Sequence, residues 1–255
     1  MVSQTPVPAF EAQGAPRMSF FERLLGMFFE PERTFQDVNR KGAWLGIFLI
    51  VAVLVTGAVF AAGTRVDQET YMRASLQQNP MTKNMPEEQI QKIVEQSKSP
   101  MQRYIGAAFT PIFMIIVYLA LAGVFLLVFV IMGVSLTFKK SLAVTIWAMA
   151  PPTILVTILG IIFIFVKDPD TLDLFDVTKN VASNLGLLVP KKEQPVLHSL
   201  LSSIDLFSFW TIFLLAVGFS TVSNQKLTKG KAALGIVMLW GAYVLAKLGF
   251  VAMFN

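Results

Sequence analysis

Apolar residues gather in five long stretches of this chain, and charged residues collect between them. About 20 apolar residues in a helix cross a hydrocarbon layer about 30 Å thick. Five transmembrane helices are therefore predicted, at about 43–63, 111–133, 142–166, 206–222 and 232–254. The second lies within an uncharged stretch, 104–138, that is too long for one straight crossing, so we place the helix inside it.

Two adjacent prolines, Pro151 and Pro152, interrupt the third predicted span near its middle. Because proline lacks an amide donor and its ring clashes with the preceding turn, we expect a kink or a break there. Carbonyl groups freed by a break could face a cavity, as in transporters with discontinuous helices. The alternative, which is commoner in membrane helices, is a proline kink that packing simply tolerates.

Two short connections set the expected orientation, because short loops rich in Lys and Arg stay in the cytoplasm. Spans two and three are joined through Lys139 and Lys140, and spans four and five through a segment with three lysines, 226–231. The N-terminus is then cytoplasmic, and the loops 64–103 and 167–205 face outward. With five spans the C-terminus, Asn255, is extracytoplasmic.

A short amphipathic helix is predicted ahead of the first span, after a flexible tail at 1–17. Its apolar face has helical spacing, while Glu22, Arg23 and Glu30 lie elsewhere; the apolar positions are Phe20, Phe21, Leu24, Leu25, Phe28 and Phe29. The helix either lies in the membrane interface or packs under the helical bundle. Pro31 fits the first turn of a following short helix, 32–38.

Both outward loops contain a further predicted helix that begins at a proline. Pro86 can open one whose apolar stripe is Ile90, Ile93 and Val94, and Pro195 can open another; the apolar side of the second holds Val196, Leu197, Leu200, Leu201 and Ile204. Such stripes either pack back on their own protein or bind a partner.

The composition agrees with a lipid environment and narrows the chemistry. The chain is 55% hydrophobic and 15% charged, with a mean hydropathy of +0.63, which one soluble core could not bury. It has no Cys and a single His, so thiolate chemistry is excluded. The net charge of +5 sits beside the apolar runs, where it sets topology against anionic lipid, so nucleic acid is not an expected partner. Without a G-x-S-x-G, H-E-x-x-H or P-loop pattern, we expect no catalytic, cofactor or metal residues and no enzyme.

Lys247 is the one clearly intramembrane charge, and a charge in hydrocarbon costs at least about 2.5 kcal/mol. Asp205, at the outward end of span four, is the nearest carboxylate by depth, so we hypothesise that the two pair across neighbouring helices. The alternative is a lysine that reaches the interface with no special role. The predicted spans hold no acidic residue, which argues against proton-coupled transport.

Four segments of the sequence resemble the bacterial branch of the Yip1 family. They are FEPERTF at Phe29–Phe35, WAMAPPTIL at Trp147–Leu155, SSIDLFSFWTIFLLAVGFSTV at Ser202–Val222 and KLTKGKA at Lys226–Ala232. The likeness covers residues 18–254. It implies a five-span bundle with a cytosolic N-terminus, as the charge pattern independently predicts. Eukaryotic members are linked to Rab GTPases and carry a D-L-Y-G-P motif, which this chain lacks, so a bacterial inner membrane protein is expected.

These observations predict an all-α polytopic membrane protein that organises membrane or protein partners and is not an enzyme. The partners would be the lipid bilayer itself, a second copy of the chain, or subunits of an export transporter. Because the resemblance links some bacterial members to ABC exporters, an accessory export subunit is the second hypothesis. A channel or small-solute carrier is the third.

Overall fold

The structure is a computed structural model, and it describes residues 17–79, 81–168, 183–191, 193–224 and 226–254. The described residues are helical and form no strand. The helices are α1 Phe20–Phe29, α2 Pro31–Lys41, α3 Leu45–Arg65, α4 Gln68–Gln78, α5 Glu87–Ser97, α6 Pro100–Ile131, α7 Phe138–Val166, the 3-10 helix η2 Leu185–Leu188, α9 Pro195–Leu201, α10 Leu206–Val222 and α11 Lys229–Phe254.

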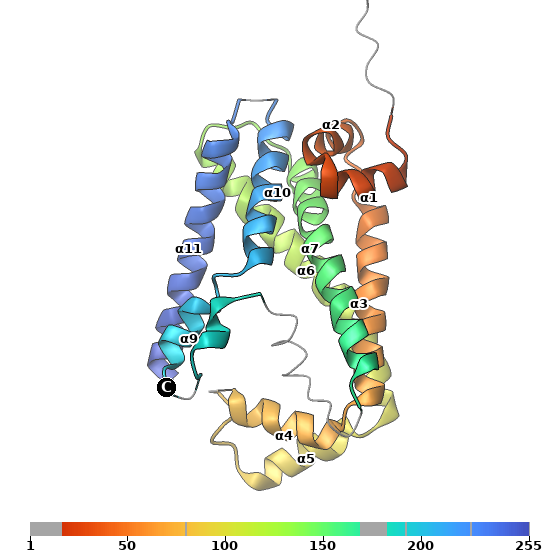
Figure 1. The fold of residues 1–255 in the computed structure, drawn as a ribbon, viewed down its shortest axis with the longest axis vertical. Coiled ribbons are helices and arrows are strands. Elements are labelled where there is room, and N and C mark those ends of the chain that lie inside the picture. Colours follow the sequence, from red (N-terminus) through yellow and green to blue (C-terminus); the bar gives the residue numbers. More distant parts are fainter. Residues whose placement is uncertain (1–16, 80, 169–182, 192, 225, 255) are drawn as a thin grey trace, which may run out of the picture.

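The long helices α3, α6, α7, α10 and α11 lie side by side, and the short helices cover the two ends of this bundle (Figure 1). We call the end that holds α1, α2 and the α6–α7 and α10–α11 connections the basic end, and the other end, with α4, α5 and α9, the opposite end. Residues 1–16 of the tail predicted at 1–17 and the predicted C-terminal position of Asn255 lie outside the described residues, as do residues 169–182 of the second loop predicted to face outward.

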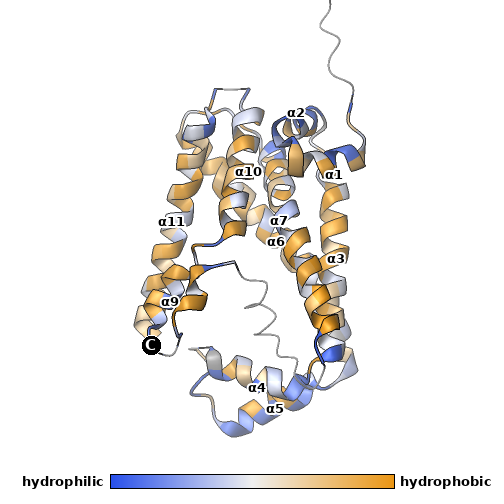
Figure 2. Ribbon diagram, in the orientation of Figure 1, coloured by the Kyte–Doolittle hydropathy of each residue, from blue (hydrophilic) through white to orange (hydrophobic). Residues whose placement is uncertain are grey.

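The long helices are apolar along their length, and polar residues gather on α2, α4 and α5 (Figure 2). Four described helices, α3, α6, α7 and α11, are long and apolar enough to cross a membrane, whereas α10 is apolar but has only 17 residues. α10 occupies the residues expected for the fourth span. α3, α7 and α11 begin or end within a few residues of their expected bounds.

The second span is longer than predicted, because α6 begins at Pro100 rather than near 111 and continues for 32 residues. Proline is well suited to a first helical turn, and no positive backbone φ ends the helix before Gly133, at +82°. At 1.5 Å per residue α6 is about 48 Å long, so it extends well beyond a hydrocarbon layer. The loop at 64–103, which the sequence predicts to face outward, is therefore mostly helical.

Of the predicted kink or break at Pro151 and Pro152, the break does not occur, since α7 continues through both prolines. Both prolines are buried, and α7 packs against α3, α6 and α10. One turn earlier, the indole nitrogen of Trp147 donates to the carbonyl of Ala43 at 2.6 Å. Neighbouring helices thus hold this stretch helical, and of the two alternatives the structure favours tolerated prolines.

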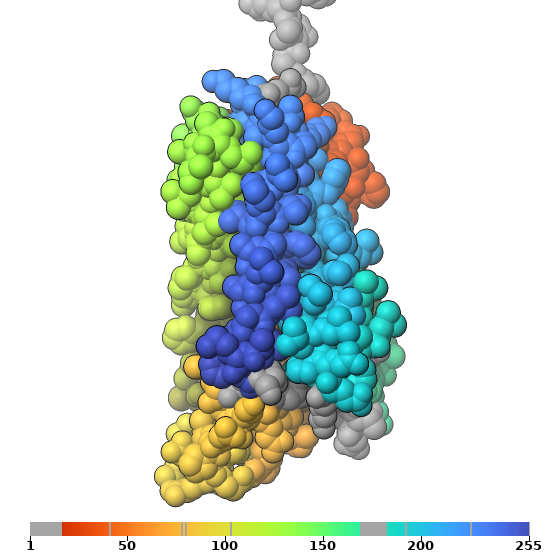
Figure 3. Space-filling model, turned by 90° about the vertical axis from the view of Figure 1, so that its left-hand side faces the viewer, coloured from red at the N-terminus to blue at the C-terminus, as the bar shows by residue number. Residues whose placement is uncertain are grey.

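The core fills the half of the bundle nearest the basic end, with Trp147, Phe129 and Phe219 among its largest fully buried side chains. The rings of Phe129 and Phe219 lie 4.5 Å apart between centroids, which joins α6 to α10. Seen from the side, α11 lies between α6 and α10 and packs on both (Figure 3).

Candidate functional sites at the two ends of the bundle

A buried ion pair joins α1 to α2 at the basic end. The Nε of Arg23 lies 2.6 Å from Oδ2 of Asp37, and both side chains are less than one-tenth exposed. The same guanidinium donates to the carbonyl of Met18 at 2.9 Å, and the Met18 amide donates to Asp37 at 3.4 Å. From the sequence, Arg23 was expected to lie away from the apolar face of α1; in the structure it is buried and, with Asp37, forms the ion pair that we call the clamp between α1 and α2.

One face of α1 packs on the bundle. The Phe20 ring contacts Trp147, with centroids 6.1 Å apart, and the Phe28 ring contacts Trp210 at 5.5 Å. Met27 on this side is fully buried. Packing under the bundle, one of the two predicted alternatives, therefore accounts for half of the helix.

The other face of α1 is apolar and exposed. Phe21 is 72% exposed, Leu25 61% and Phe29 81%. If α1 only packed against the bundle, polar residues would be expected at these positions. Because the clamp and the ring contacts fix the rotation of α1, these side chains are held outward rather than left there by chance.

α2 continues this end towards α10 and α7. Gly42 ends α2 in the left-handed region, at φ +58°, as glycine does at many helix C-termini. The ammonium of Lys229, in α11, lies 2.6 Å from the Glu32 carboxylate of α2. The lysine-bearing connections and the N-terminal helices thus meet at one end of the molecule.

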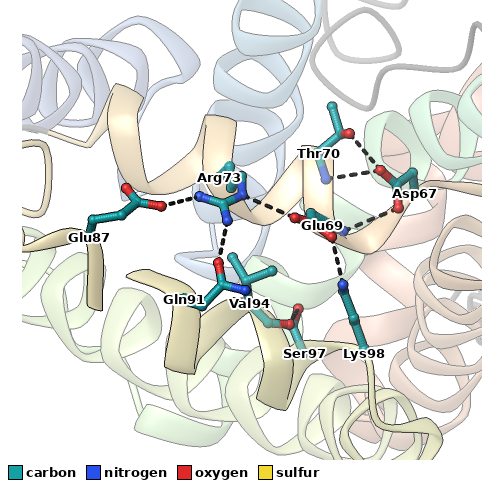
Figure 4. A network of polar contacts seen from close by, with 9 residues as sticks. All are labelled: Asp67, Glu69, Thr70, Arg73, Glu87, Gln91, Val94, Ser97 and Lys98. Carbon is teal, nitrogen blue, oxygen red and sulfur yellow. Dashed lines mark hydrogen bonds and ion pairs between the residues drawn. The ribbon is translucent and has the colours of Figure 1, made fainter. Parts of the chain in front are cut away.

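The opposite end carries a polar network between α4 and α5, drawn in Figure 4. Arg73 lies at its centre: its Nε is 3.2 Å from Glu69, one Nη is 2.6 Å from Glu87, and the other contacts the side-chain oxygen of Gln91. Glu69 also pairs with Lys98, 2.6 Å away. The network locks α4 on α5 outside the apolar part of the molecule.

The charges of this network reinforce one another. Hydrogen bonds from Lys98 and Arg73 lower the pKa of Glu69 below its ordinary value, and bonds from the Thr70 hydroxyl and amide lower the pKa of Asp67. Bonds to Glu87 and Glu69 raise the pKa of Arg73. All of these shifts favour the charged forms, so the network holds its ions through the neutral pH range.

The helix predicted after Pro86 is confirmed as α5, and its stripe packs back on its own protein. Ile90 and Val94 are buried between α5 and α4. The helix predicted after Pro195 is confirmed as α9, which packs on α11 and η2. Val196 and Leu197 of α9 remain about 40% exposed.

Lys247 and Asp205 lie at the opposite end of the long helices, but among the described residues they do not form the hypothesised ion pair. The Lys247 ammonium donates to the Ser199 carbonyl and the Ser203 hydroxyl, both 3.1 Å away, and so ties α11 to α9. The Asp205 carboxylate instead caps α10, accepting from the amides of Phe207 and Ser208 at 2.9 and 3.1 Å. A carboxylate at this position accepts hydrogen bonds from first-turn amides that have no partner inside the helix. Capping α10 therefore takes precedence over an ion pair with Lys247.

Two features of these sites, the Arg23–Asp37 clamp and helix α4, were not predicted from the sequence. The clamp joins two different helices, so the spacing within one helix does not predict it. The one sequence signal was that Arg23 stands between apolar positions. α4 had a readable signal: Asp67 is an N-cap residue whose carboxylate accepts from the amides of Glu69 and Thr70.

Comparison with protein families gives one match: the Yip1 domain fits residues 25–251, nearly the whole chain. No curated protein and no solved structure matches it significantly. The match begins within α1, covers α2, α3, α6, α7 and α10 in full, and ends within the last turn of α11, so it includes most of the basic end as well as the bundle. The four apolar helices that are long enough to cross a bilayer agree with it, and the chain is a membrane protein that belongs to the Yip1 family.

Proposed function

We propose that this protein is a non-enzymatic scaffold of the bacterial inner membrane that organises lipid and protein partners around a five-span bundle. In this proposal α10, the fourth span along the chain, crosses the bilayer in addition to the four longer helices, and the basic end faces the cytoplasm. The charge distribution supports the orientation, because short basic connections stay inside. The basic residues at that end include Arg17, Arg33, Arg40, Lys139, Lys140, Lys226, Lys229 and Lys231.

The observation that carries the proposal is the outward apolar face of α1. A helix clamped against a membrane bundle with Phe21, Leu25 and Phe29 exposed matches a helix that lies in the headgroup region with these side chains among the acyl chains. At the start of α1, Ser19 and Glu22 form a capping box, which gives hydrogen-bond partners to backbone amides of the first turn. The protein thereby holds a fixed wedge in one leaflet.

Spin labelling tests the wedge directly, because a chain without cysteine accepts a single label at any chosen site. Leu25→Cys and Phe29→Cys proteins in liposomes should be relaxed more by oxygen, which dissolves in lipid, than by a water-soluble nickel complex. The control, Gln77→Cys on α4, should show the reverse. Labels at 25 and 29 that respond mainly to nickel would contradict an interfacial α1.

Topology is tested separately with reporters that work only in the periplasm. A reporter fused after Asn255 should be active, and one inserted at Lys140 should be inactive. The opposite pattern would invert the proposed orientation. Equal activity of a C-terminal and a Lys140 fusion would leave an even number of crossings between them and remove α10 as a span.

The α4–α5 hairpin supports a second candidate, an accessory subunit of an export transporter. A polar network holds this hairpin together beyond the apolar helices, where it can meet extracytoplasmic proteins. Extraction in a mild detergent followed by mass spectrometry of stoichiometric companions tests this candidate. An ATPase or permease that is recovered with the wild type and lost with Arg73→Ala would support it, whereas recovery of the chain alone would favour the self-contained scaffold.

A further inference from the structure

The opposite end carries an apolar surface that the proposed function does not use. It belongs to η2 and α9, which pack on each other and which we call the η2–α9 unit. Leu188 is 77% exposed and Leu187 52%. The other exposed apolar side chains of the unit are Leu185, Val196, Leu197 and Leu200. Within the two helices only His198 is titratable. A contiguous surface of this kind needs a partner that is itself apolar.

The depth of the unit can be judged along α11. This helix has Lys229 and Lys231 in its first turn, so its apolar part begins at Ala232. About 20 residues at 1.5 Å each cross a hydrocarbon layer of about 30 Å, and this path ends near Val251. Lys247 stands four residues earlier, so its Cα lies about 6 Å inside the layer. A tilted α11 would place it deeper.

Contacts with α10 and α11 hold α9 at the same depth. The Lys247 ammonium donates to the Ser199 carbonyl and to the Ser203 hydroxyl, both 3.1 Å away. The rings of Phe209 and Trp240 lie 6.5 Å apart between centroids, so α10 begins beside the turn of α11 that precedes Lys247. α9 lies just beyond this start, beside the last turns of α11 (Figure 1). The unit therefore stands at the edge of the hydrocarbon layer and not far outside it.

The backbone of the unit is suited to this depth. Inside the hydrocarbon each backbone amide and carbonyl needs a partner within the protein. The Leu185 amide donates to the Ile204 carbonyl at 3.2 Å, which joins the start of η2 to the segment after α9. The Nδ1 atom of His198 lies 2.8 Å from the Val189 carbonyl, just after η2. The irregular stretches beside the two helices thus use partners from the unit itself.

The turn that connects η2 to α9 is polar. Its described residues include Lys191, Glu193 and Gln194, and all three are exposed. The charges of this region therefore gather at the turn, while the exposed side chains of the two helices are apolar. An element that lies in a membrane interface has this division, with a charged part in water and an apolar part among the acyl chains.

We infer that the η2–α9 unit inserts into the leaflet at the opposite end, and that its partner is the acyl chains of membrane lipid. Interfacial elements lie about 5–10 Å into the headgroup and acyl boundary, which agrees with the depth of Lys247. A bilayer that α11 crosses already brings lipid to this depth, where Leu245 of α11 is exposed as well. The inference rests on the crossing of α11, which is part of the proposed function. It requires neither the proposed orientation nor the insertion of α1.

Single spin labels on the full-length protein in liposomes test the insertion. Labels at Leu188→Cys and Leu197→Cys should be relaxed more by oxygen than by a water-soluble nickel complex. Gln194→Cys, in the polar turn, is the matched control and should show the reverse. The ratio of oxygen to nickel accessibility should be severalfold higher at 188 and 197 than at 194. Leu245→Cys reports separately whether α11 lies in the bilayer.

The other outcomes of this experiment contradict the inference in different ways. Labels at 188 and 197 that favour nickel, while the label at 245 favours oxygen, would overturn it and leave the crossing of α11 intact. Low accessibility to both reagents would show that protein covers the surface and would overturn it as well. Spectral broadening that dilution with unlabelled protein removes would identify that cover as a second copy. A label at 245 that favours nickel would remove the crossing of α11 and the inference together.

Gly186 offers a variant that moves η2 without changing its leucines. A methyl group there would overlap the Ser202 hydroxyl and lie 3.0 Å from the Ser202 Cα, so Gly186→Ala should displace η2 from α9. The freed backbone groups then turn to water, and the label at Leu188 should lose most of its preference for oxygen. Gly249→Ala on α11, whose methyl would meet nothing within 4 Å in the described chain, is the control and should keep it. An unchanged preference in Gly186→Ala would overturn the placement of η2 by α9.

Discussion

The two ends of the bundle use the same chemical pair, a guanidinium and a carboxylate, in opposite surroundings. At the basic end Arg23 and Asp37 are almost fully buried, whereas at the opposite end Arg73 and its carboxylate partners are reached by solvent, with Glu87 72% exposed at its side chain. A buried pair that loses one partner leaves an uncompensated charge, whereas water and salt replace much of an exposed pair. Removing one partner of the buried pair should therefore strongly destabilise the basic end. The exposed pairs of the opposite end should weaken only gradually, for example with rising salt concentration.

Among the substitutions that test this difference between the two ends, Asp37→Ala should have the largest effect on stability. The substitution should lower the free energy of unfolding by about 3–5 kcal/mol, because Arg23 remains buried without a carboxylate. The midpoint of denaturant-induced unfolding in detergent micelles measures this. Glu30→Ala, which removes the exposed pair with Arg33, is the control and should leave the midpoint unchanged.

The double variant Arg23→Met with Asp37→Leu sharpens the same point. Replacing both charges with apolar groups of similar size should restore most of the lost stability, since no buried charge remains. A double variant as unstable as Asp37→Ala would mean that the hydrogen bonds from Arg23 to Asp37 and Met18, and not the stranded charge, carry the effect.

The second effect concerns packing at the basic end. A methyl group added at Gly218 would lie 2.6 Å from a methyl of Val144 and 2.9 Å from the ring of Phe35, so Gly218→Ala should cost about 1–3 kcal/mol. The control at the opposite end is Gly63→Ala, whose methyl would meet its nearest neighbour, Gln68, at 3.9 Å. Thermal unfolding should show Gly218→Ala below and Gly63→Ala at or above the wild type.

Lys247→Met tests the internal contact of the opposite end. The variant loses two hydrogen bonds to α9 but no longer buries a charge, so we expect a net loss of about 1 kcal/mol. Faster hydrogen exchange should be confined to α9. Stability and exchange equal to the wild type would mean that the lysine only reaches toward the interface.

The smallest effect is the pH dependence of the α4–α5 hairpin. The pKa values of Asp67 and Glu69 are lowered in the folded state, so their stabilisation is complete above the ordinary carboxyl range, at about pH 4–4.5, and is lost as pH falls through the lowered values. Amide exchange in α4 should therefore accelerate between about pH 4 and pH 3 relative to α2. Glu69→Gln should show this acceleration already at neutral pH, and an unchanged profile would remove the network as the cause.

Much of the fold follows from the apolar pattern, because each long run has one stable solution in lipid, a helix with all backbone groups bonded internally. α10 was predicted at its observed residues for this reason. The start of α6 was missed because a length rule assumes that a helix stops at the edge of the hydrocarbon, whereas Pro100 and an uninterrupted helical sequence continue it. At Pro151 and Pro152 the sequence left a break and a tolerated kink open, because a single sequence does not show the neighbouring helices that support the prolines.

The candidate sites were less predictable than the fold. Periodicity gave the apolar positions of α1 but assigned Arg23 to the polar face, since its partner stands on another helix. The hypothesis that Lys247 pairs with Asp205 rested only on their similar depth in the membrane. It did not consider that the first turn of α10 needs a capping residue, which Asp205 provides. The apolar surface of η2 was not predicted, because so short a helix shows no helical period and its place depends on the contact with α9.

The unequal lengths of the long helices have a consequence for where the protein resides. α10 spans about 25 Å at 1.5 Å per residue, which is less than a hydrocarbon layer of about 30 Å, while α6 exceeds it. If α10 crosses the bilayer as proposed, this hydrophobic mismatch favours a bilayer that thins beside α10 and lets α6 tilt or protrude. The protein should therefore deform the bilayer unequally around its circumference, with the thinnest lipid beside α10.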